Sequence, residues 1–365
     1  MSSRTAFRLT KAAAPLFSIP RATAPRAVPA ATRAFQKSAI RQKSDVVAET
    51  EIPVSVYSTD AKGTGQSSSD HYSIPVSREN AKPSAISSEP DDTVTPLTQK
   101  VYSSLPPTMQ KMSIMDKVVV VTGGARGLGN YMARACAEAG AKALVIFDAN
   151  QELGDESAAE LHAKTGLPVT FFKVDVRDGA AINAAVDSVV ELYGAPDVLI
   201  NSAGIADSNI KAETYDPAMF RRLIDINLTG SFLMSQAVGR AMMAANKPGS
   251  IVLVASMSGS IVNYPQEQSC YNASKAGVIQ FGKSLAAEWA KYNIRVNCIS
   301  PGYMDTALNR VPALDAQKKI WKSLTPQDRL GAVDDLNGLA VFLASDASSF
   351  MTGSNVIIDG GYTCY

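Results

Sequence analysis

The pattern of apolar and polar residues changes near residue 114. From there on, short runs rich in Val, Ile and Phe alternate with longer Ala-rich stretches whose apolar residues recur at helical spacing. Such alternation is typical of a parallel sheet flanked by helices. The predicted strands are residues 117–122, 142–147, 168–174, 197–200, 250–255, 295–300 and 355–359. The pattern therefore predicts one α/β domain over residues 114–365, with a doubly wound (Rossmann-type) sheet of seven parallel strands that must contain the active site.

The first 113 residues have no comparable pattern. Residues 1–44 contain nine Lys and Arg and no acidic residue, a composition typical of a mitochondrial transit peptide. A disordered basic tail is the alternative, because four prolines in this stretch would break a long helix. Residues 45–113 are rich in Ser, Thr, Pro and Asp and are predicted to form a disordered linker. We therefore expect a mitochondrial matrix location, with the cytoplasm as the alternative.

Composition excludes several classes of partner. The chain has 365 residues, 46% of them apolar, and a net charge of +1, which gives no excess of positive charge for nucleic acid. Its longest apolar run is far short of the roughly 20 residues that a membrane span requires. The cysteines are too far apart for a metal site or a disulfide framework, so neither is expected. These four predicted reduced thiols are Cys136, Cys270, Cys298 and Cys364.

A glycine-rich segment, TGGARGLG, follows the first predicted strand and precedes a helix expected to begin near Leu128. Gly123, Gly127 and Gly129 would let the backbone turn sharply and approach a pyrophosphate, whose charge the helix N-terminus would attract. Glycines also occur in strand-to-helix turns for packing reasons alone. The segment, with Leu128 among its cofactor-binding residues, thus predicts a dinucleotide-binding loop if other features support it.

An acidic residue supplies that support. Asp148 ends the second predicted strand, where its carboxylate could accept hydrogen bonds from the adenosine ribose hydroxyls. This position favours NAD over NADP, because a 2′-phosphate would face a like charge. Arg126, inside the glycine loop, could instead meet that phosphate, so NADP stays the second choice. Asp148 could also be an ordinary helix cap.

Polar residues follow the third and fourth predicted strands. Asp175 and Asn201 stand at carboxyl ends of strands, where ligands bind in open parallel sheets. Both are predicted cofactor contacts, although either could simply be a turn former.

The candidate catalytic residues lie between the fifth and sixth strands. Tyr271 and Lys275 are four residues apart on a predicted long helix, so both side chains project from one face. An ammonium about 4 Å from the phenol would lower its pKa from about 10 to roughly 7. Ser258, just after the fifth strand, could hold a substrate oxygen. A Tyr–Lys pair at this spacing is common on helix surfaces, and its position after a dinucleotide loop is what favours catalysis.

Together these segments resemble the short-chain dehydrogenase/reductase family, a likeness carried by TGGARGLG, NSAG, DINLTG, the Ser258–Lys275 segment and SPGYMDT. The resemblance implies Tyr271 as general acid/base and Lys275 as the residue that lowers its pKa and binds the nicotinamide ribose. It implies that Asn227 holds a water linked to Lys275, with an internal amide bond as the alternative. It also implies nicotinamide contacts at Met304 and Thr306.

The segment around Tyr271 and the C-terminal DGGYTCY most resemble the fungal polyol branch of this family. Asn263, Gln266 and Gln268 would then offer polar groups to a polyhydroxylated substrate, or alternatively cap a loop. Residues 311–324 are expected to form a lid, with Leu314 and Trp321 excluding water.

The expected reaction is NAD-linked interconversion of D-arabinitol and D-ribulose. The alternatives are reduction of L-xylulose, sorbose, fructose (to mannitol) or a 3-oxoacyl thioester, and a non-catalytic dinucleotide-binding module. The family resemblance also implies a homodimer or homotetramer.

Overall fold

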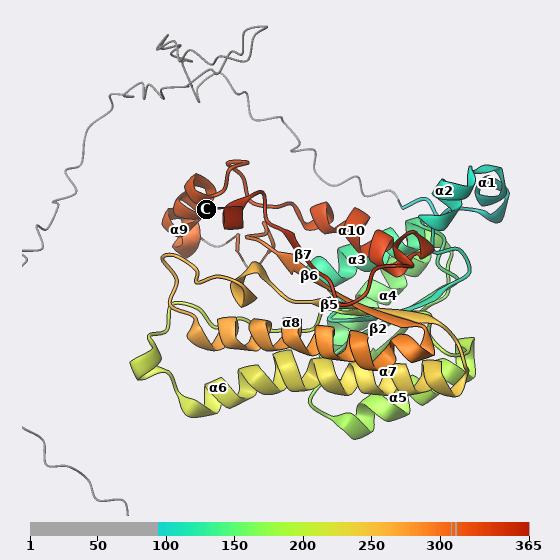
Figure 1. The fold of residues 1–365 in the computed structure, drawn as a ribbon, viewed down its shortest axis with the longest axis horizontal. Helices are drawn as coiled ribbons and strands as arrows, with labels where there is room; N and C mark the ends of the chain where they lie inside the picture. Colours follow the sequence, from blue (N-terminus) through green and yellow to red (C-terminus); the bar gives the residue numbers. More distant parts are fainter. Residues whose placement is uncertain (1–93, 308, 311, 365) are drawn as a thin grey trace, which may run out of the picture. The chain divides into compact units, whose positions relative to one another are not determined.

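A computed structural model describes residues 94–307, 309–310 and 312–364. Its centre is a sheet, part of which is labelled in Figure 1. The sheet has seven strands in the order β3-β2-β1-β4-β5-β6-β7, and every pair of neighbouring strands is parallel. The strands are β1 (Val118–Thr122), β2 (Ala143–Asp148), β3 (Val169–Lys173), β4 (Val198–Asn201), β5 (Gly249–Val254), β6 (Ile294–Pro301) and β7 (Asn355–Ile358). The predicted fold class is confirmed, and each predicted strand overlaps one of these.

Strand β1 shows why the sheet is covered on both faces. Its run of valines is buried throughout, and alternate side chains point to opposite faces. Val118 and Val120 pack in one hydrophobic core cluster with helices α5 (Gly179–Tyr193), α7 (Gly230–Ala244) and α8 (Ser269–Trp289). Val119 and Val121 pack in a second cluster with α3 (Gly127–Glu138), α4 (Gln151–Thr165) and α10 (Asn337–Ala344). A strand buried on both faces reads as a continuous apolar run, which is the pattern seen in the sequence.

Helices lie on both faces of the sheet (Figure 1). They are α3 (Gly127–Glu138), α4 (Gln151–Thr165), α5 (Gly179–Tyr193), α6 (Pro217–Ile224), α7 (Gly230–Ala244), α8 (Ser269–Trp289), α9 (Asp315–Leu324) and α10 (Asn337–Ala344). A π-helical turn, Asp225–Thr229, joins α6 to α7. No helix among the described residues is long and apolar enough to cross a membrane.

The strand order reverses between β1 and β4, which are adjacent although β2 and β3 intervene in the chain. In open parallel sheets a crevice forms at the carboxyl ends of such neighbouring strands, and ligands bind there. The glycine-rich loop follows β1 and the NSAG segment begins at the end of β4. The topology therefore brings two of the predicted cofactor segments to one edge of the sheet.

The predicted linker is wrong for its last twenty residues. Helices α1 (Gln99–Ser104) and α2 (Pro107–Lys111) occupy this stretch, and Val94 is buried in the core cluster that includes α3. The Leu97 N–H donates to the carbonyl of Glu138 at 2.9 Å, which fixes the segment to the end of α3. The transit peptide predicted at 1–44 and the linker at 45–93 lie outside the described residues.

Candidate active site

Backbone geometry explains the glycines of the loop after β1. Gly123 and Gly127 have φ values of +64° and +60°, a region that residues with a Cβ rarely adopt. A Cβ on Gly129 would overlap the carbonyl oxygen of Gly123, so the loop folds back on the start of α3 only with glycine there. Helix α3 begins at Gly127, one residue before the predicted start, while Leu128 packs against the core beneath the loop. The free N–H groups of this first turn suit a pyrophosphate.

Asp148 is held beside that loop. Its carboxylate accepts hydrogen bonds from the N–H groups of Asn150, at 3.0 Å, and of Ala125, at 3.3 Å. The side chain is therefore fixed at the end of β2 and stays partly exposed. Arg126 is exposed at the N-cap of α3, with its backbone extended. Both residues lie where they could meet an adenosine ribose or its 2′-phosphate.

The structure places Asp175 and Asn201 in different surroundings. Arg177 binds the Asp175 carboxylate through Nε, at 3.0 and 3.1 Å, and lowers the pKa of Asp175. Asn201 is buried, where its amide accepts from Thr122 Oγ1 at 2.8 Å and donates to the Ser231 carbonyl at 3.1 Å. Its side chain thus joins β4 to β1 and α7, and a direct cofactor contact for it stays a prediction.

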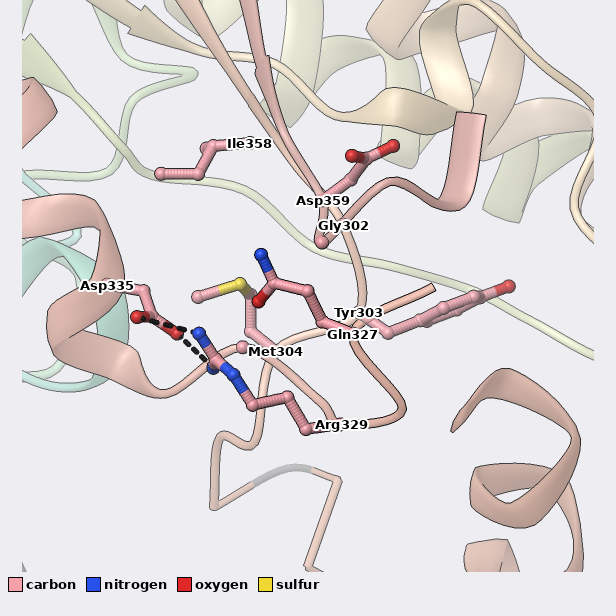
Figure 2. Close-up of a pocket in the computed structure, with 10 residues that line it drawn as sticks. Gly302, Tyr303, Met304, Gln327, Arg329, Asp335, Ile358 and Asp359 are labelled. Carbon is pink, nitrogen blue, oxygen red and sulfur yellow. Dashed lines mark hydrogen bonds and ion pairs between the residues drawn. The ribbon is translucent and has the colours of Figure 1, made fainter. Parts of the chain in front are cut away.

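Met304 and Thr306 follow β6. Met304 is buried and forms an isolated parallel bridge with Gly331, whereas Thr306 is partly exposed and donates its N–H to the Met304 carbonyl. A cavity of about 190 Å³ is lined in part by Met304. Figure 2 shows Tyr303 pointing away from the Arg329–Asp335 ion pair that borders this cavity.

The predicted catalytic residues come together at the carboxyl end of β5. Ser258 lies in a short 3-10 turn, Met257–Gly259, that packs on α8: a Cβ on Gly259 would lie 2.7 Å from the backbone carbonyl carbon of Lys275. Tyr271 and Lys275 share one face of α8, with Lys275 Nζ 5.7 Å from the centre of the Tyr271 ring. Lys275 is buried and donates to the Val254 carbonyl at 2.8 Å.

The electrostatics differ from the prediction. Burial lowers the pKa of Lys275 to about 8, and burial also raises the pKa of Tyr271, while the neighbouring Ser256 hydroxyl lowers it by less. A Tyr271 pKa near 7 is therefore wrong for the protein alone, because burial disfavours the charged phenolate and the ammonium of Lys275 is itself desolvated. An oxidised nicotinamide, when bound, supplies the additional positive charge that would lower the pKa of the phenol.

Asn227 lies in the π-helical turn, near Lys275. Its amide accepts from the Ile205 N–H at 2.9 Å and donates to the Ile205 carbonyl at 2.9 Å and to Ser274 Oγ at 3.0 Å. A Cβ on Gly204 would lie 3.2 Å from Asn227 Oδ1 and 3.6 Å from Lys275 Nζ, so all three lie close together. Asn227 thus ties the loop after β4 to α8, and the water link stays a prediction.

A polar wall, defined here as Ser258, Asn263, Gln266, Gln268 and Tyr303, runs from the catalytic turn toward the lid. Gln268 Nε2 lies 3.2 Å from Ser258 Oγ and 2.7 Å from Asn263 Oδ1. Asn263 Nδ2 donates to the Tyr303 hydroxyl at 3.0 Å, and that hydroxyl donates to Gln266 Oε1 at 2.7 Å. The three predicted substrate residues therefore belong to one network with Ser258.

Sequence reasoning missed Tyr303, whose ring joins the wall to two other segments. It stacks on Trp321 of α9, with ring centres 4.2 Å apart and planes at 7°, and meets Tyr362 edge-on at 5.3 Å. The predicted lid is thus partly helical, and its Trp321 is buried against Tyr303, while Leu314 is partly buried. The aromatic residue in SPGYMDT was the available signal, but its partners are distant in sequence.

The part of the chain that the structure describes holds no cluster of metal-binding side chains and no reactive thiol in its core. Among residues 94–307, 309–310 and 312–364, no group of three or more His, Cys, Asp and Glu could hold a metal ion. The four cysteines are free, three of them buried and Cys364 exposed. Burial raises the pKa of Cys136 and that of Cys298 to about 12, so both stay thiols.

Comparison with known proteins agrees with this site. Residues 123–363 match a family model described as enoyl-(acyl carrier protein) reductase. An NADP-dependent mannitol dehydrogenase of Alternaria alternata is 42% identical over 253 residues, which cover 68% of this chain and 93% of the relative. A ribulose-forming D-arabinitol 2-dehydrogenase of Scheffersomyces stipitis is 40% identical over 264 residues, covering 68% and 94%. A solved NAD⁺-bound xylitol dehydrogenase is similar at a TM-score of 0.64 and 34% identity, covering 68% of this chain and all of that one.

Proposed function

Because the chain belongs to the short-chain dehydrogenase/reductase family, we propose that it transfers a hydride between NAD(P) and a sugar alcohol/ketose pair. The observation that carries this proposal is the polar wall, which starts at Ser258 and presents amide and phenol groups beside the catalytic pair. Hydroxyl groups of a polyol could both donate to and accept from such side chains. The relatives named mannitol and D-arabinitol dehydrogenases support the same substrate class.

In the oxidation direction, Tyr271 takes the hydroxyl proton of the substrate and Ser258 holds the same oxygen by a hydrogen bond. Lys275 stabilises the phenolate by its charge, and its bond to the Val254 carbonyl keeps it in place. In reduction the proton moves from Tyr271 to the substrate oxygen. The glycine loop and the carboxyl ends of β1 and β4 would hold the dinucleotide, whose nicotinamide accepts or supplies the hydride.

Our preferred substrate pair is D-arabinitol and D-ribulose. Mannitol/fructose, sorbose and L-xylulose are the close alternatives, since they present a similar array of hydroxyl groups. A 3-oxoacyl thioester fits less well, because its alkyl chain would lie against the polar wall without forming a hydrogen bond to it. A module without catalysis would have no use for Ser258, Tyr271 and Lys275 in this arrangement.

For the cofactor we prefer NAD. The Asp148 carboxylate would accept from the ribose hydroxyls and would repel a 2′-phosphate. Arg126 supports NADP as the alternative, and relatives carry both names: the Alternaria enzyme is called NADP-dependent, and the xylitol dehydrogenase binds NAD⁺. If the Asp148 carboxylate sets the preference, Asp148→Asn should lower the ratio of kcat/KM with NAD to kcat/KM with NADP by about tenfold.

Location and assembly are further parts of the proposal. The basic, acid-free residues 1–44 support import into the mitochondrial matrix, which N-terminal sequencing of the protein from isolated mitochondria would test. A homodimer or homotetramer would cover apolar surface on α7, where Phe232 is 42% exposed and meets Phe281 of α8 edge-on. Sedimentation of the full chain would show its assembly, and a monomer would contradict this part.

The decisive experiment measures initial rates of oxidation of D-arabinitol, xylitol, D-mannitol and D-sorbitol, with NAD and with NADP. We expect D-arabinitol with NAD to be oxidised fastest. Tyr271→Phe should lower the rate by about a thousandfold while dinucleotide binding persists, because only the proton transfer is lost. Dinucleotide binding without oxidation of any polyol would contradict the proposed substrate class.

A further inference from the structure

Gln268 is the residue of the polar wall that directly contacts the catalytic serine. It is the N-cap residue of α8 and is buried, three residues before Tyr271. Its side-chain nitrogen lies within hydrogen-bond distance of three oxygens: Ser258 Oγ at 3.2 Å, Asn263 Oδ1 at 2.7 Å and Asn272 Oδ1 at 2.9 Å. The amide therefore points into the wall, where sequence reasoning had expected it to contact the substrate.

The neighbours of Gln268 fix which way its amide points. Asn272 donates its own amide to the Ile261 carbonyl, and Asn263 donates to the Tyr303 hydroxyl, so both present their oxygens to Gln268. A flipped Gln268 would place Oε1 against two amide oxygens and lose both bonds. The nitrogen of Gln268 is thus the atom that faces Ser258.

This orientation has a consequence for the serine proton. The amide nitrogen of Gln268 has two hydrogens for three neighbouring oxygens, so the contact to Ser258 Oγ, the longest of the three, shares a hydrogen with an asparagine contact. Because an amide NH₂ group donates and does not accept, the Ser258 hydroxyl cannot donate to Gln268. The hydroxyl proton of Ser258 must then point elsewhere. The Ser258 N–H already donates to Ser256 Oγ at 3.1 Å, which fixes the backbone of the turn.

We propose that Gln268 is a positioning residue, which orients the Ser258 hydroxyl so that its proton faces the substrate oxygen. Ser258 would then donate a hydrogen bond to the carbonyl oxygen of the substrate during reduction. During oxidation it would donate to the hydroxyl oxygen of the substrate while that hydroxyl gives its proton to Tyr271. No proton is transferred by Ser258 itself, because Tyr271 gives and takes it. The inference rests on the proposed function only in that Ser258 contacts the substrate oxygen.

A double-mutant cycle tests whether Gln268 acts through Ser258. Hydride transfer is measured in single turnovers for the full chain, Ser258→Ala, Gln268→Ala and the double variant. We expect Gln268→Ala alone to slow hydride transfer about tenfold, the worth of one lost hydrogen bond. In the Ser258→Ala background the same change should slow it by less than twofold. Additive losses would overturn the proposal, because they would show that Gln268 acts independently of Ser258.

A second variant tests the direction of the hydrogen bond. Glutamate in place of Gln268 donates when protonated, but its carboxylate can only accept and would turn the Ser258 proton away from the substrate. The ratio of Gln268→Glu to wild-type reduction rates should therefore rise as the pH falls. The titratable groups around it are Tyr271, Lys275 and Tyr303, and the new carboxylate shifts their pKa values. The same pH series on Gln268→Glu in the Ser258→Ala background measures that shift, which is subtracted. A ratio independent of pH would overturn the proposal.

Two controls separate a specific role of Gln268 from general damage to α8 and from an error in the proposed substrate class. Gln280→Ala makes the same change on an exposed part of α8 and should keep the wild-type rate. The cycle is run with whichever substrate the wild type converts best, in a panel of polyols, ketoses, diketones and 3-oxoacyl thioesters. A non-polyol substrate would contradict the proposed function, yet the cycle would still decide the role of Gln268.

Discussion

The two sides of the active site are built by different means. The cofactor side, the loop from Gly123 to Gly129 with Asp148, relies on backbone conformation and on residues close together in the chain. The substrate side relies on side-chain pairs between distant segments, such as Asn263 with Tyr303 and Tyr303 with Trp321. A backbone change in the glycine loop should therefore damage both folding and dinucleotide binding, whereas a side-chain change in the polar wall should alter substrate binding or turnover and leave dinucleotide binding unchanged.

The largest effect is expected from Gly129→Ala on the cofactor side. The new Cβ would meet the backbone of Gly123, which cannot move without opening the loop. We expect the free energy of unfolding to fall by about 2–4 kcal/mol and dinucleotide affinity to fall at least tenfold. Denaturant titration and fluorescence titration with NAD would measure the two losses.

Gly338→Ala is the matched control for that change. Gly338 is an exposed residue of α10 with open space around its missing side chain. Alanine there should stabilise the protein by about 0.5–1 kcal/mol, because it favours the helix. If Gly129→Ala were equally harmless, the cofactor loop would not depend on its backbone as we argue.

Lys275 lies between the two sides, and its burial has a cost. A folded-state pKa of about 8, against about 10.4 in the unfolded chain, disfavours the protonated form in the folded protein by about 3 kcal/mol. Met in place of Lys275 has no charge to bury, which stabilises the folded protein. The hydrogen bond to the Val254 carbonyl is lost, which destabilises it by about 1 kcal/mol. Lys275→Met should therefore be inactive, yet more stable at pH 7 by about 2 kcal/mol.

The pH dependence of that gain follows from the direction of the shift. Between pH 8 and about pH 10.4 the unfolded chain holds more protons at Lys275 than the folded protein, so wild-type stability from this group rises with pH. The advantage of Lys275→Met should be constant below pH 8 and shrink above it. Thermal unfolding at pH 7, 8, 9 and 10 would show the trend, and an advantage that grows with pH would contradict it.

On the substrate side, Tyr303→Phe removes one hydroxyl and keeps the aromatic stack. Asn263 and Gln266 would each lose a hydrogen-bond partner in the wall, so the free energy of substrate binding should weaken by about 1–1.5 kcal/mol in total. We expect the KM for the polyol to rise about tenfold while the dinucleotide Kd stays within twofold. Initial rates at varied polyol concentration would give the first value and titration the second. An equal loss of dinucleotide affinity would contradict the claim that the polar wall affects substrate binding and not dinucleotide binding.

The cofactor side could be predicted from the sequence more completely than the substrate side, because its parts are close together in the chain. Strand runs, the glycine loop and the Tyr271–Lys275 spacing are local patterns, and the structure has each of them at its predicted place. Tyr303 was missed because its partners Asn263, Trp321 and Tyr362 are 18 to 59 residues away, and only the fold brings them together. The predicted pKa of Tyr271 was wrong because the spacing of residues in the sequence gives no measure of how deeply the phenol is buried.

The smallest expected effect concerns the contact between the lid and the loop after β4. Asn209 and Gln317 of α9 exchange amide hydrogen bonds of 3.5 and 3.1 Å, and both contacts are exposed to solvent. Exposed polar pairs contribute little, so Gln317→Ala should raise the KM for the polyol less than threefold, with Lys319→Ala on the same helix as the control. A double-mutant cycle with Asn209→Ala should give a coupling energy of about 0.5 kcal/mol. If the pair instead changed KM by tenfold or more, a single contact at the lid would outweigh the buried wall, and the substrate side would depend on closure rather than on its polar network.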